Sequence, residues 1–274
     1  MKDKIITFIG GGNMASSLIG GLLETGIAPE NLRILDPNPE PLASQFPVQR
    51  YTDQLAAIKG ADVVVFAVKP DVLHDVAKSI ATVMPTQPPL FISIAAGICI
   101  TDLARWLSVD QKLAIVRVMP NTPALVASGA SALFADEYVS DDQRVLAENI
   151  LRAVGLTLWL ENETQMDAVT ALSGSGPAYF FLMMEVLEKA GISLGLPQKS
   201  ARLLILQTAF GAAKMALESQ EDAATLRARV TSKGGTTEEA IRILQASGFQ
   251  NMFDQALQAA EQRSISLAKQ FGEQ

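Results

Sequence analysis

Cysteine and histidine are almost absent from this sequence, which has one of each among 274 residues. A single cysteine, Cys99, excludes an internal disulfide framework and fits a reducing compartment, so we expect a cytoplasmic protein. One cysteine and one histidine, His74, exclude a His/Cys metal site and argue against a Ser-His-Asp triad. The sequence therefore predicts chemistry without a bound metal.

Long hydrophobic runs and basic clusters are also lacking. The longest apolar run, residues 91–100, is about half the length of a membrane span. The first residues, Met-Lys-Asp-Lys, lead directly into a short strand pattern, without the apolar segment of a signal peptide. The 22 Lys and Arg residues are outnumbered by 29 Asp and Glu, for a net charge of −7. We expect neither a membrane nor a nucleic acid as partner.

Apolar residues make up 49% of the chain, enough for a substantial core. In the first 160 or so residues, short apolar runs alternate with helical patterns. The predicted strands are residues 5–9, 32–35, 62–68, 90–94 and 113–118. Buried strands separated by helices predict an α/β fold, a doubly wound parallel sheet of Rossmann type. We assign residues 1–161 to this dinucleotide-binding domain.

Helical spacing dominates the rest of the chain, so residues 162–274 are predicted to form an all-α domain. Residues 179–190, 203–217 and 249–271 are its clearest helices. Residues 201–216 carry only Arg202 and Lys214 as charges and are apolar on more than one face. Such a helix lies inside a bundle or under a second subunit; a domain this thin favours the second subunit.

A glycine-rich turn follows the first predicted strand directly and opens a helix. Gly10, Gly12 and Ala15 form a G-x-G-x-x-A pattern within Gly10-Gly11-Gly12-Asn13-Met14-Ala15. In a dinucleotide site the first glycine permits the tight turn and the second lets backbone approach a pyrophosphate at the helix N-terminus. At this place in a βαβ unit the pattern predicts a nucleotide site.

The second predicted strand ends at Asp36, 26 residues after Gly10. A carboxylate there binds ribose hydroxyls and repels a 2′-phosphate, which favours NADH. The alternative is that Asp36 only caps the following helix, and Asn38 is placed to donate to a phosphate. NADPH therefore stays open as the cofactor.

Two further strands end in segments suited to a cofactor. Ala67-Val68-Lys69-Pro70 lies at the carboxyl edge of the sheet, where Lys69 is expected beside the nicotinamide ribose or the phosphates. Ala95, Ala96 and Gly97 are small, as expected where a flat ring lies against backbone. The same small residues would also permit close packing of a helix on the sheet.

Two segments of the helical half begin helices with small and hydroxyl-bearing residues. Leu172-Ser-Gly-Ser-Gly-Pro-Ala-Tyr179 is one, and Ser232-Lys-Gly-Gly-Thr-Thr237 is the other. Each places free backbone N–H groups beside hydroxyls, which is a site for a small carboxylate, although either could be an ordinary helix start.

These segments together resemble the pyrroline-5-carboxylate reductases. The matching strings, in chain order, are the turn with Asn13-Met14, residues 67–70, 93–97, 119–123 (Met-Pro-Asn-Thr-Pro), 172–179 and 234–237. The resemblance implies a Rossmann domain followed by a helical domain that interlocks with a second subunit. It also implies larger assemblies, commonly decamers.

The resemblance also implies roles for single residues. The residues that would contact the cofactor are Gly11, Asn13, Met14 and Lys69, with Asn38 near its adenosine end. Glu163 matches a residue near the substrate nitrogen, and Thr237 matches the candidate for hydrogen bonding to the ring nitrogen. Lys233 stands where the family often has proline, and Asp36 where it often has small hydroxyl or basic residues.

The substrate implied is the cyclic imino acid 1-pyrroline-5-carboxylate, reduced to L-proline by hydride from NADPH or NADH in the last step of proline biosynthesis. A protonated ring imine is already electrophilic, so the protein mainly orients it against the nicotinamide. Thr237 would orient the ring nitrogen. The groups expected to meet the substrate carboxylate or ring are those of Ser175, Gly234, Gly235 and Thr236.

Three other functions also go with a Rossmann domain followed by a helical domain. A hydroxyacid dehydrogenase needs a catalytic lysine, and neither Lys189 nor Lys199 lies in a matching motif. A ketol-acid reductoisomerase needs carboxylates arranged for two magnesium ions, which the helical half does not show. A nucleotide sensor without activity would have no use for the two small-residue helix starts.

Overall fold

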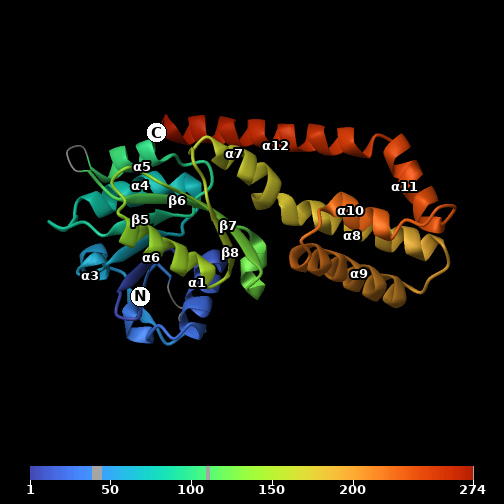
Figure 1. The fold of residues 1–274 in the computed structure, drawn as a ribbon. Helices are drawn as coiled ribbons and strands as arrows, with labels where there is room; N and C mark the ends of the chain where they lie inside the picture. Colours follow the sequence, from blue (N-terminus) through green and yellow to red (C-terminus); the bar gives the residue numbers. More distant parts are fainter. Residues whose placement is uncertain (39–44, 109–111, 274) are drawn as a thin grey trace. The chain divides into compact units, whose positions relative to one another are not determined.

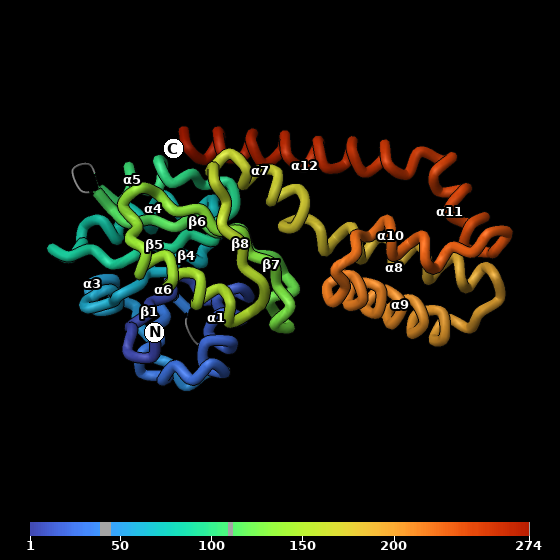
Figure 2. Tube along the Cα trace, viewed as in Figure 1, coloured from blue at the N-terminus to red at the C-terminus, as the bar shows by residue number. Residues whose placement is uncertain are grey.

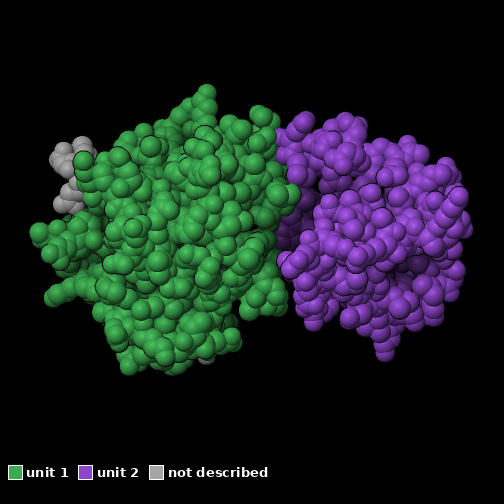
Figure 3. Space-filling model, viewed as in Figure 1, with its two compact units in different colours: residues 1–175, 259–274 green, residues 176–258 purple. Residues whose placement is uncertain are grey.

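The structure is a computed structural model that describes residues 1–38, 45–108 and 112–273. It divides into two compact units, one formed by residues 1–175 with 259–274 and the other by residues 176–258 (Figure 3). The boundary expected after residue 161 marks the end of the last strand, whereas contacts group the following fourteen residues and the end of the chain with the sheet. The division by function, cofactor domain and substrate domain, stays a proposal.

The first unit is built on a sheet in which eight strands are described, in the order β3-β2-β1-β4-β5-β6-β7-β8. The strands are β1 (Ile6–Ile9), β2 (Leu32–Leu35), β3 (Gln49–Tyr51), β4 (Val63–Phe66), β5 (Leu90–Ser93), β6 (Ile115–Met119), β7 (Gly129–Ala135) and β8 (Gly155–Trp159). β1 to β6 are parallel in the 3-2-1-4-5-6 order of dinucleotide-binding sheets. β7 runs antiparallel to β6, with Val116 opposite Ala135, and β8 runs parallel to β7.

Helices cover both faces of this sheet (Figure 1). Their bounds are α1 (Asn13–Glu24), α3 (Gln54–Ile58), α4 (Pro70–Ala81), α5 (Ile100–Leu107), α6 (Asp141–Arg152) and α7 (Gln165–Val169), with 3-10 turns η1 (Pro29–Asn31) and η2 (Thr122–Val126). α1 and α6 pack on the face that carries Phe8, while α3, α4 and α5 pack on the face that carries Phe66. The β1 and β4 residues on both faces are fully buried, which is why these strands read as continuous apolar runs.

The end of the chain belongs to the same unit. α12 (Phe249–Gly272) places Phe271 against the core that contains Phe66. The Ser264 hydroxyl, almost fully buried, donates to Asp167 Oδ1 at 2.6 Å, and Arg105 donates to the Gly272 carbonyl at 2.6 Å. Residues 259–274 therefore complete a fold that the first 175 residues begin.

The second unit is helical, as the spacing of apolar residues predicts (Figure 2). It contains α8 (Gly176–Ser193), α9 (Gln198–Glu218), α10 (Ala223–Arg229), α11 (Thr236–Ala246) and the first part of α12. α8 and α9 pack against each other, yet many large apolar side chains on them stay exposed. These are Phe180, Phe181, Leu182, Val186, Leu187, Leu203, Leu204, Leu206, Phe210, Met215 and Leu217. Across the described residues, no helix is long and apolar enough to cross a bilayer.

Candidate active site

The glycine-rich turn joins β1 to α1 at the carboxyl edge of the sheet. Gly10 has φ +98°, and a Cβ placed there would lie 2.8 Å from the Ala67 carbonyl oxygen at the end of β4. A Cβ on Gly12, by contrast, would meet nothing within 4 Å. Gly12 is the N-cap of α1 and, as a glycine, gives no side-chain hydrogen bond to the first turn, so no cap from the described residues meets the N–H groups of Asn13 and Met14. This is a cradle open to a phosphate.

Asp36 lies directly beside this turn. Its Oδ2 accepts from the Gly11 N–H at 2.7 Å, and its Oδ1 accepts from the Asn38 N–H at 2.7 Å. The carboxylate therefore joins the end of β2 to the turn after β1 and holds a negative charge at the position where the sequence predicts a ribose contact. The neighbouring residues 39–44, where the sequence predicts the following helix, lie outside the described residues.

Lys69 and Pro70 open α4 immediately after β4. Lys69 is the N-cap of that helix and Pro70 its first residue, where a missing N–H costs nothing. The exposed Lys69 side chain makes no ion pair with any described residue. Its ammonium is thus free to meet an anionic ligand at the carboxyl edge.

Ala95, Ala96 and Gly97 follow β5, and Gly97 has φ +73°. A Cβ on Gly97 would lie 3.4 to 3.5 Å from Phe271, Ala268 and Leu267 of α12. The absent side chain at this position thus makes room for the C-terminal helix, the packing alternative that the sequence left open. A cofactor contact at Ala95 or Ala96 remains a prediction.

Glu163 is held in a partly buried ion pair. Arg117, in the middle of β6 and 5% exposed, donates to Glu163 Oε1 at 2.9 Å. The same oxygen accepts from the N–H of Ile100, the first residue of α5, at 2.8 Å. Arg117 also lies 3.5 Å from the Cys99 sulfur. Burial raises the pKa of the Cys99 thiol, and the positive charge of Arg117 only partly offsets this.

The segment 172–179 contains a feature that spacing does not reveal. Residues Thr170–Gly174 form a single π-helical turn, η3, in which the Ser175 N–H donates to the Thr170 carbonyl at 2.8 Å. α8 then begins at Gly176, with Pro177 in its first turn. Such π-turns are frequent at functional sites.

The second small-residue segment lies in the other unit, at the start of α11. Gly234 has φ +72°, and its N–H donates to Glu238 Oε2 at 2.6 Å. Gly235 is the N-cap of α11, so Thr236 and Thr237 occupy the first turn, where no side chain caps the backbone N–H groups. The half-buried Thr237 hydroxyl has no hydrogen-bond partner among the described residues.

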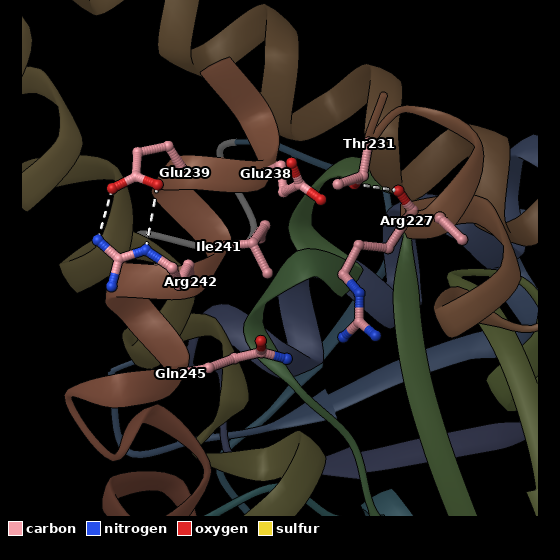
Figure 4. Close-up of a pocket in the computed structure, with 8 residues that line it drawn as sticks. Arg227, Thr231, Glu238, Glu239, Ile241, Arg242 and Gln245 are labelled. Atoms are coloured by element: carbon pink, nitrogen blue, oxygen red, sulfur yellow. Dashed lines mark hydrogen bonds and ion pairs between the residues drawn. The ribbon is translucent and has the colours of Figure 1, made fainter. Parts of the chain in front are cut away.

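A pocket of about 500 Å³ adjoins this loop between α10 and α11 (Figure 4). Its lining residues are Arg227, Ala228, Thr231, Glu238, Glu239, Ile241, Arg242 and Gln245. Figure 4 shows Arg242 turned toward Glu239, with which it is paired, while Arg227 extends into the open space. Sequence reasoning missed this pocket. Among all the residues that the structure describes, no group of three or more His, Cys, Asp or Glu side chains is placed to hold a metal.

Comparison with known proteins now gives the family. Residues 163–267 match the pyrroline-5-carboxylate reductase dimerisation family, and residues 5–97 match the coenzyme F420-dependent NADP oxidoreductase family. The pyrroline-5-carboxylate reductase of Pseudomonas aeruginosa is 49% identical over 276 residues, covering all of both chains. The chain belongs to the pyrroline-5-carboxylate reductase family.

Solved structures of the pyrroline-5-carboxylate reductase family agree with this. The enzyme of Coxiella burnetii superposes with a TM-score of 0.91 at 42% identity, over 96% of this chain and 98% of that one. The Plasmodium falciparum pyrroline carboxylate reductase, solved with NADP bound, has a TM-score of 0.86 at 29% identity, over 98% and 99%. The predicted fold class and family are therefore confirmed.

The predicted site residues of this reductase are found in both units. The first unit brings together the turn at Gly10, Asp36 and the end of β4 at Ala67. It also carries Glu163 and Ser175, and the second unit carries Gly234 to Thr237. The role predicted for each of these side chains stays a proposal.

Proposed function

We propose that this chain reduces 1-pyrroline-5-carboxylate to L-proline with hydride from NADPH or NADH, as the last step of proline biosynthesis. The observation that carries the assignment is the end-to-end 49% identity with a curated pyrroline-5-carboxylate reductase. The local geometry supports it. An open glycine turn lies at one edge of a dinucleotide-binding sheet, and at the same edge Lys69 has no ion pair with any described residue. The protein is an NAD(P)H-dependent oxidoreductase acting on a cyclic C=N bond.

The nucleotide pyrophosphate is assigned to the turn at Gly10, Gly11 and Gly12. The open space at Gly12 and the uncapped first turn of α1 fit a bound phosphate. The remaining cofactor contacts are assigned to Asn13, Met14, Asp36, Asn38, Ala67, Val68, Lys69, Pro70, Ala95, Ala96 and Gly97. When bound, the reduced nicotinamide supplies the hydride, and the protein supplies position and a dry site.

The imino-acid carboxylate is assigned to the backbone N–H groups of the Gly234–Gly235 loop and Thr236, with the Ser175 hydroxyl. Neutral donors at helix starts suit a small carboxylate, because the helix dipole adds favourable charge there. Thr237, whose hydroxyl has no hydrogen-bond partner among the described residues, would donate to or orient the ring nitrogen. Glu163 is assigned as the acidic group near that nitrogen. Its Oε1 accepts from Arg117 and Ile100, so we assign the contact with the ligand to Oε2.

Little acid catalysis is required of these residues. A protonated ring imine is a strong electrophile, so orientation of the two rings and exclusion of water carry most of the rate. The thiol at Cys99 takes no part, since its raised pKa keeps it protonated and its sulfur lies against Arg117.

Self-association follows from the dimerisation family match and from the exposed apolar side chains of α8 and α9. A dimer, or a decamer built from dimers, is the assembly we propose, in the cytoplasm. The small-molecule ligand that we propose is a cyclic imino acid, the substrate.

The test is an absorbance assay of NADH and NADPH oxidation with 1-pyrroline-5-carboxylate, and with hydroxy- and keto-acids as controls. Turnover with the cyclic imine alone is expected. Tight nucleotide binding without turnover of any substrate would instead indicate a sensor, and turnover of the hydroxy- or keto-acids would indicate another dehydrogenase.

A further inference from the structure

One side chain joins the loop after β6 to the π-helical turn η3. Asn121 Nδ2 donates to the Ser173 carbonyl at 3.1 Å, and Asn121 Oδ1 accepts from the Ala130 N–H, near the start of β7, at 2.8 Å. The two bonds leave one orientation for the amide, because only its nitrogen donates and only its oxygen accepts. The half-buried Asn121 thus connects the start of β7, nine residues later, with the turn η3, 52 residues later.

The carbonyl that Asn121 reaches is one that the chain's own helix cannot serve in the usual way. In an α-helix each carbonyl accepts from the N–H four residues later, and the residue four after Ser173 is Pro177. Proline has no N–H. A carbonyl left without a donor is costly away from water, and the Asn121 amide provides the missing one.

A second side chain, that of Met119 just before this loop, contacts the turn η3. A Cβ placed on Gly174 would lie 2.3 Å from the Met119 Cε, so the methionine fills the space that the glycine leaves. Met119 ends β6, a buried strand of the sheet. The sheet therefore fixes the position of the turn through two neighbouring side chains.

Ser175 follows the turn η3 directly, so the position of η3 determines where the Ser175 hydroxyl lies. The Ser173 hydroxyl is already used, since it donates to the Val169 carbonyl at 3.1 Å. The Ser175 hydroxyl has no partner among the described residues, while its backbone N–H is bonded within the turn to Thr170. Within the described residues of this segment, Ser175 is therefore the serine whose hydroxyl is open to a ligand, and it lies two residues after the carbonyl that Asn121 holds.

We propose that Asn121 is a positioning residue for substrate binding: it supplies the hydrogen bond that Pro177 cannot make and so holds Ser175 toward the imino-acid carboxylate. This rests on the function proposed above. Asn121 itself touches neither substrate nor nucleotide in this scheme. Its effect is on the affinity for the imino acid, and the nucleotide site at Gly10 to Gly12 is independent of it.

The first test is Asn121→Asp, which keeps the oxygen that accepts from Ala130 and replaces the donor with a second acceptor. We expect the KM for 1-pyrroline-5-carboxylate to rise about ten-fold, as for loss of one hydrogen bond, while kcat and the Kd for nucleotide change less than about two-fold. Asn31→Asp is the matched control, because Asn31 also donates to a backbone carbonyl, that of Lys2, at 2.8 Å. It should leave all three constants unchanged.

The second test combines Asn121→Asp with Pro177→Ala, which gives residue 177 an N–H able to donate to Ser173. The effect of Asn121→Asp on the imino-acid KM should then shrink to about three-fold or less, because the carbonyl has another donor. A merely structural role for Asn121 predicts the same fold-change in both backgrounds. If the aspartate variant does not fold, as checked by thermal melting, Asn121→Ala is compared in the same two backgrounds.

The outcomes separate cleanly. Three results would overturn the inference: an unchanged imino-acid KM in Asn121→Asp, an equal loss of nucleotide affinity, or an equal effect of Asn121→Asp with and without Pro177. Turnover by the wild-type protein would in each case still support the proposed reductase activity. Absence of wild-type turnover would overturn the proposed function, and this inference with it.

Discussion

Among single residues, Thr237 is the one with the most specific proposed task. It lies in the first turn of α11, and its hydroxyl has no partner within the part of the chain that the structure describes. Thr237→Ala should lower kcat by about a hundred-fold, the scale of a misplaced reactant, because the ring nitrogen loses the group that orients it, with nucleotide Kd nearly unchanged. Thr237→Ser keeps the hydroxyl and should retain most of the activity. Normal turnover in Thr237→Ala would remove this residue from the mechanism.

Asp36 sets the charge that a nucleotide ribose would meet. Asp36→Ser removes the negative charge beside the Gly11 N–H, so a 2′-phosphate is no longer repelled there. We expect the ratio of kcat/KM for NADPH over NADH to rise about ten-fold or more. Asp53→Ser, at a helix N-cap, is the control and should leave the ratio unchanged. An unaltered preference in Asp36→Ser would mean that this carboxylate only ties β2 to the turn.

Cys99 is the only thiol in the chain, so its reactivity is measured without interference. Because burial raises its pKa, the folded protein holds less thiolate at a given pH than an unfolded chain. A disulfide reagent should therefore react more slowly with native than with urea-unfolded protein at mildly alkaline pH, and the native rate should keep rising above the usual thiol range. Equal native and unfolded rates would contradict the raised pKa.

The local parts of the site could be predicted from sequence, and the long-range parts could not. The spacing of Gly10 and Gly12 directly after a strand predicts the dinucleotide-binding turn, because few backbone conformations connect a strand to a helix so tightly. The partners of Glu163 and Asn121 come from segments 46 and 52 residues away, and no periodicity encodes such contacts. The one available signal was Pro177, whose missing N–H requires an outside donor for Ser173.

At the scale of elements, the Glu163 ion pair joins β6 to the start of α5. Glu163→Gln would leave the Arg117 guanidinium buried without a full charge partner. The free energy of unfolding should fall by about 2 kcal/mol, less than for a fully buried pair because Glu163 is partly exposed.

Urea unfolding measures this change. Glu185→Gln breaks the exposed pair with Lys189 on α8 and serves as the control, with no shift of the midpoint expected. If both substitutions have the same effect, the pair in the first unit contributes nothing beyond a surface contact.

The strands that the sequence missed have identifiable physical reasons. β3 is three residues long and begins Gln-Arg, so it lacks an apolar pattern. β7 is rich in alanine and glycine, which have low strand propensity, and it follows an antiparallel turn of the chain. β8 is an edge strand whose Leu156 and Leu158 are exposed, the reverse of the usual pattern. The five strands predicted correctly are the buried parallel ones, where burial on both faces leaves an apolar run.

For the whole molecule, the exposed apolar surface of α8 and α9 has to be covered for the protein to stay in solution. Phe210 is 64% exposed on α9. Phe210→Glu should shift the protein to a smaller species in size-exclusion chromatography with light scattering, because a charge in an apolar interface is costly to bury. Leu55→Glu, an equally drastic change at an exposed leucine of α3, is the control and should leave the mass unchanged. A mass unaffected by Phe210→Glu would place the contact elsewhere.

The return of α12 to the sheet has a consequence for how the protein is made. The Rossmann segments emerge from the ribosome first, but Ser264 and Phe271, which pack beside Asp167 and the β5–α5 loop, are synthesised after the whole of the second unit. The first unit therefore stays unfinished until residues 259–274 have been made, and the surface that they cover is exposed until then. A nascent chain stalled before these codons would present that surface to chaperones and proteases, so folding of the first unit has to wait for its most distant segment.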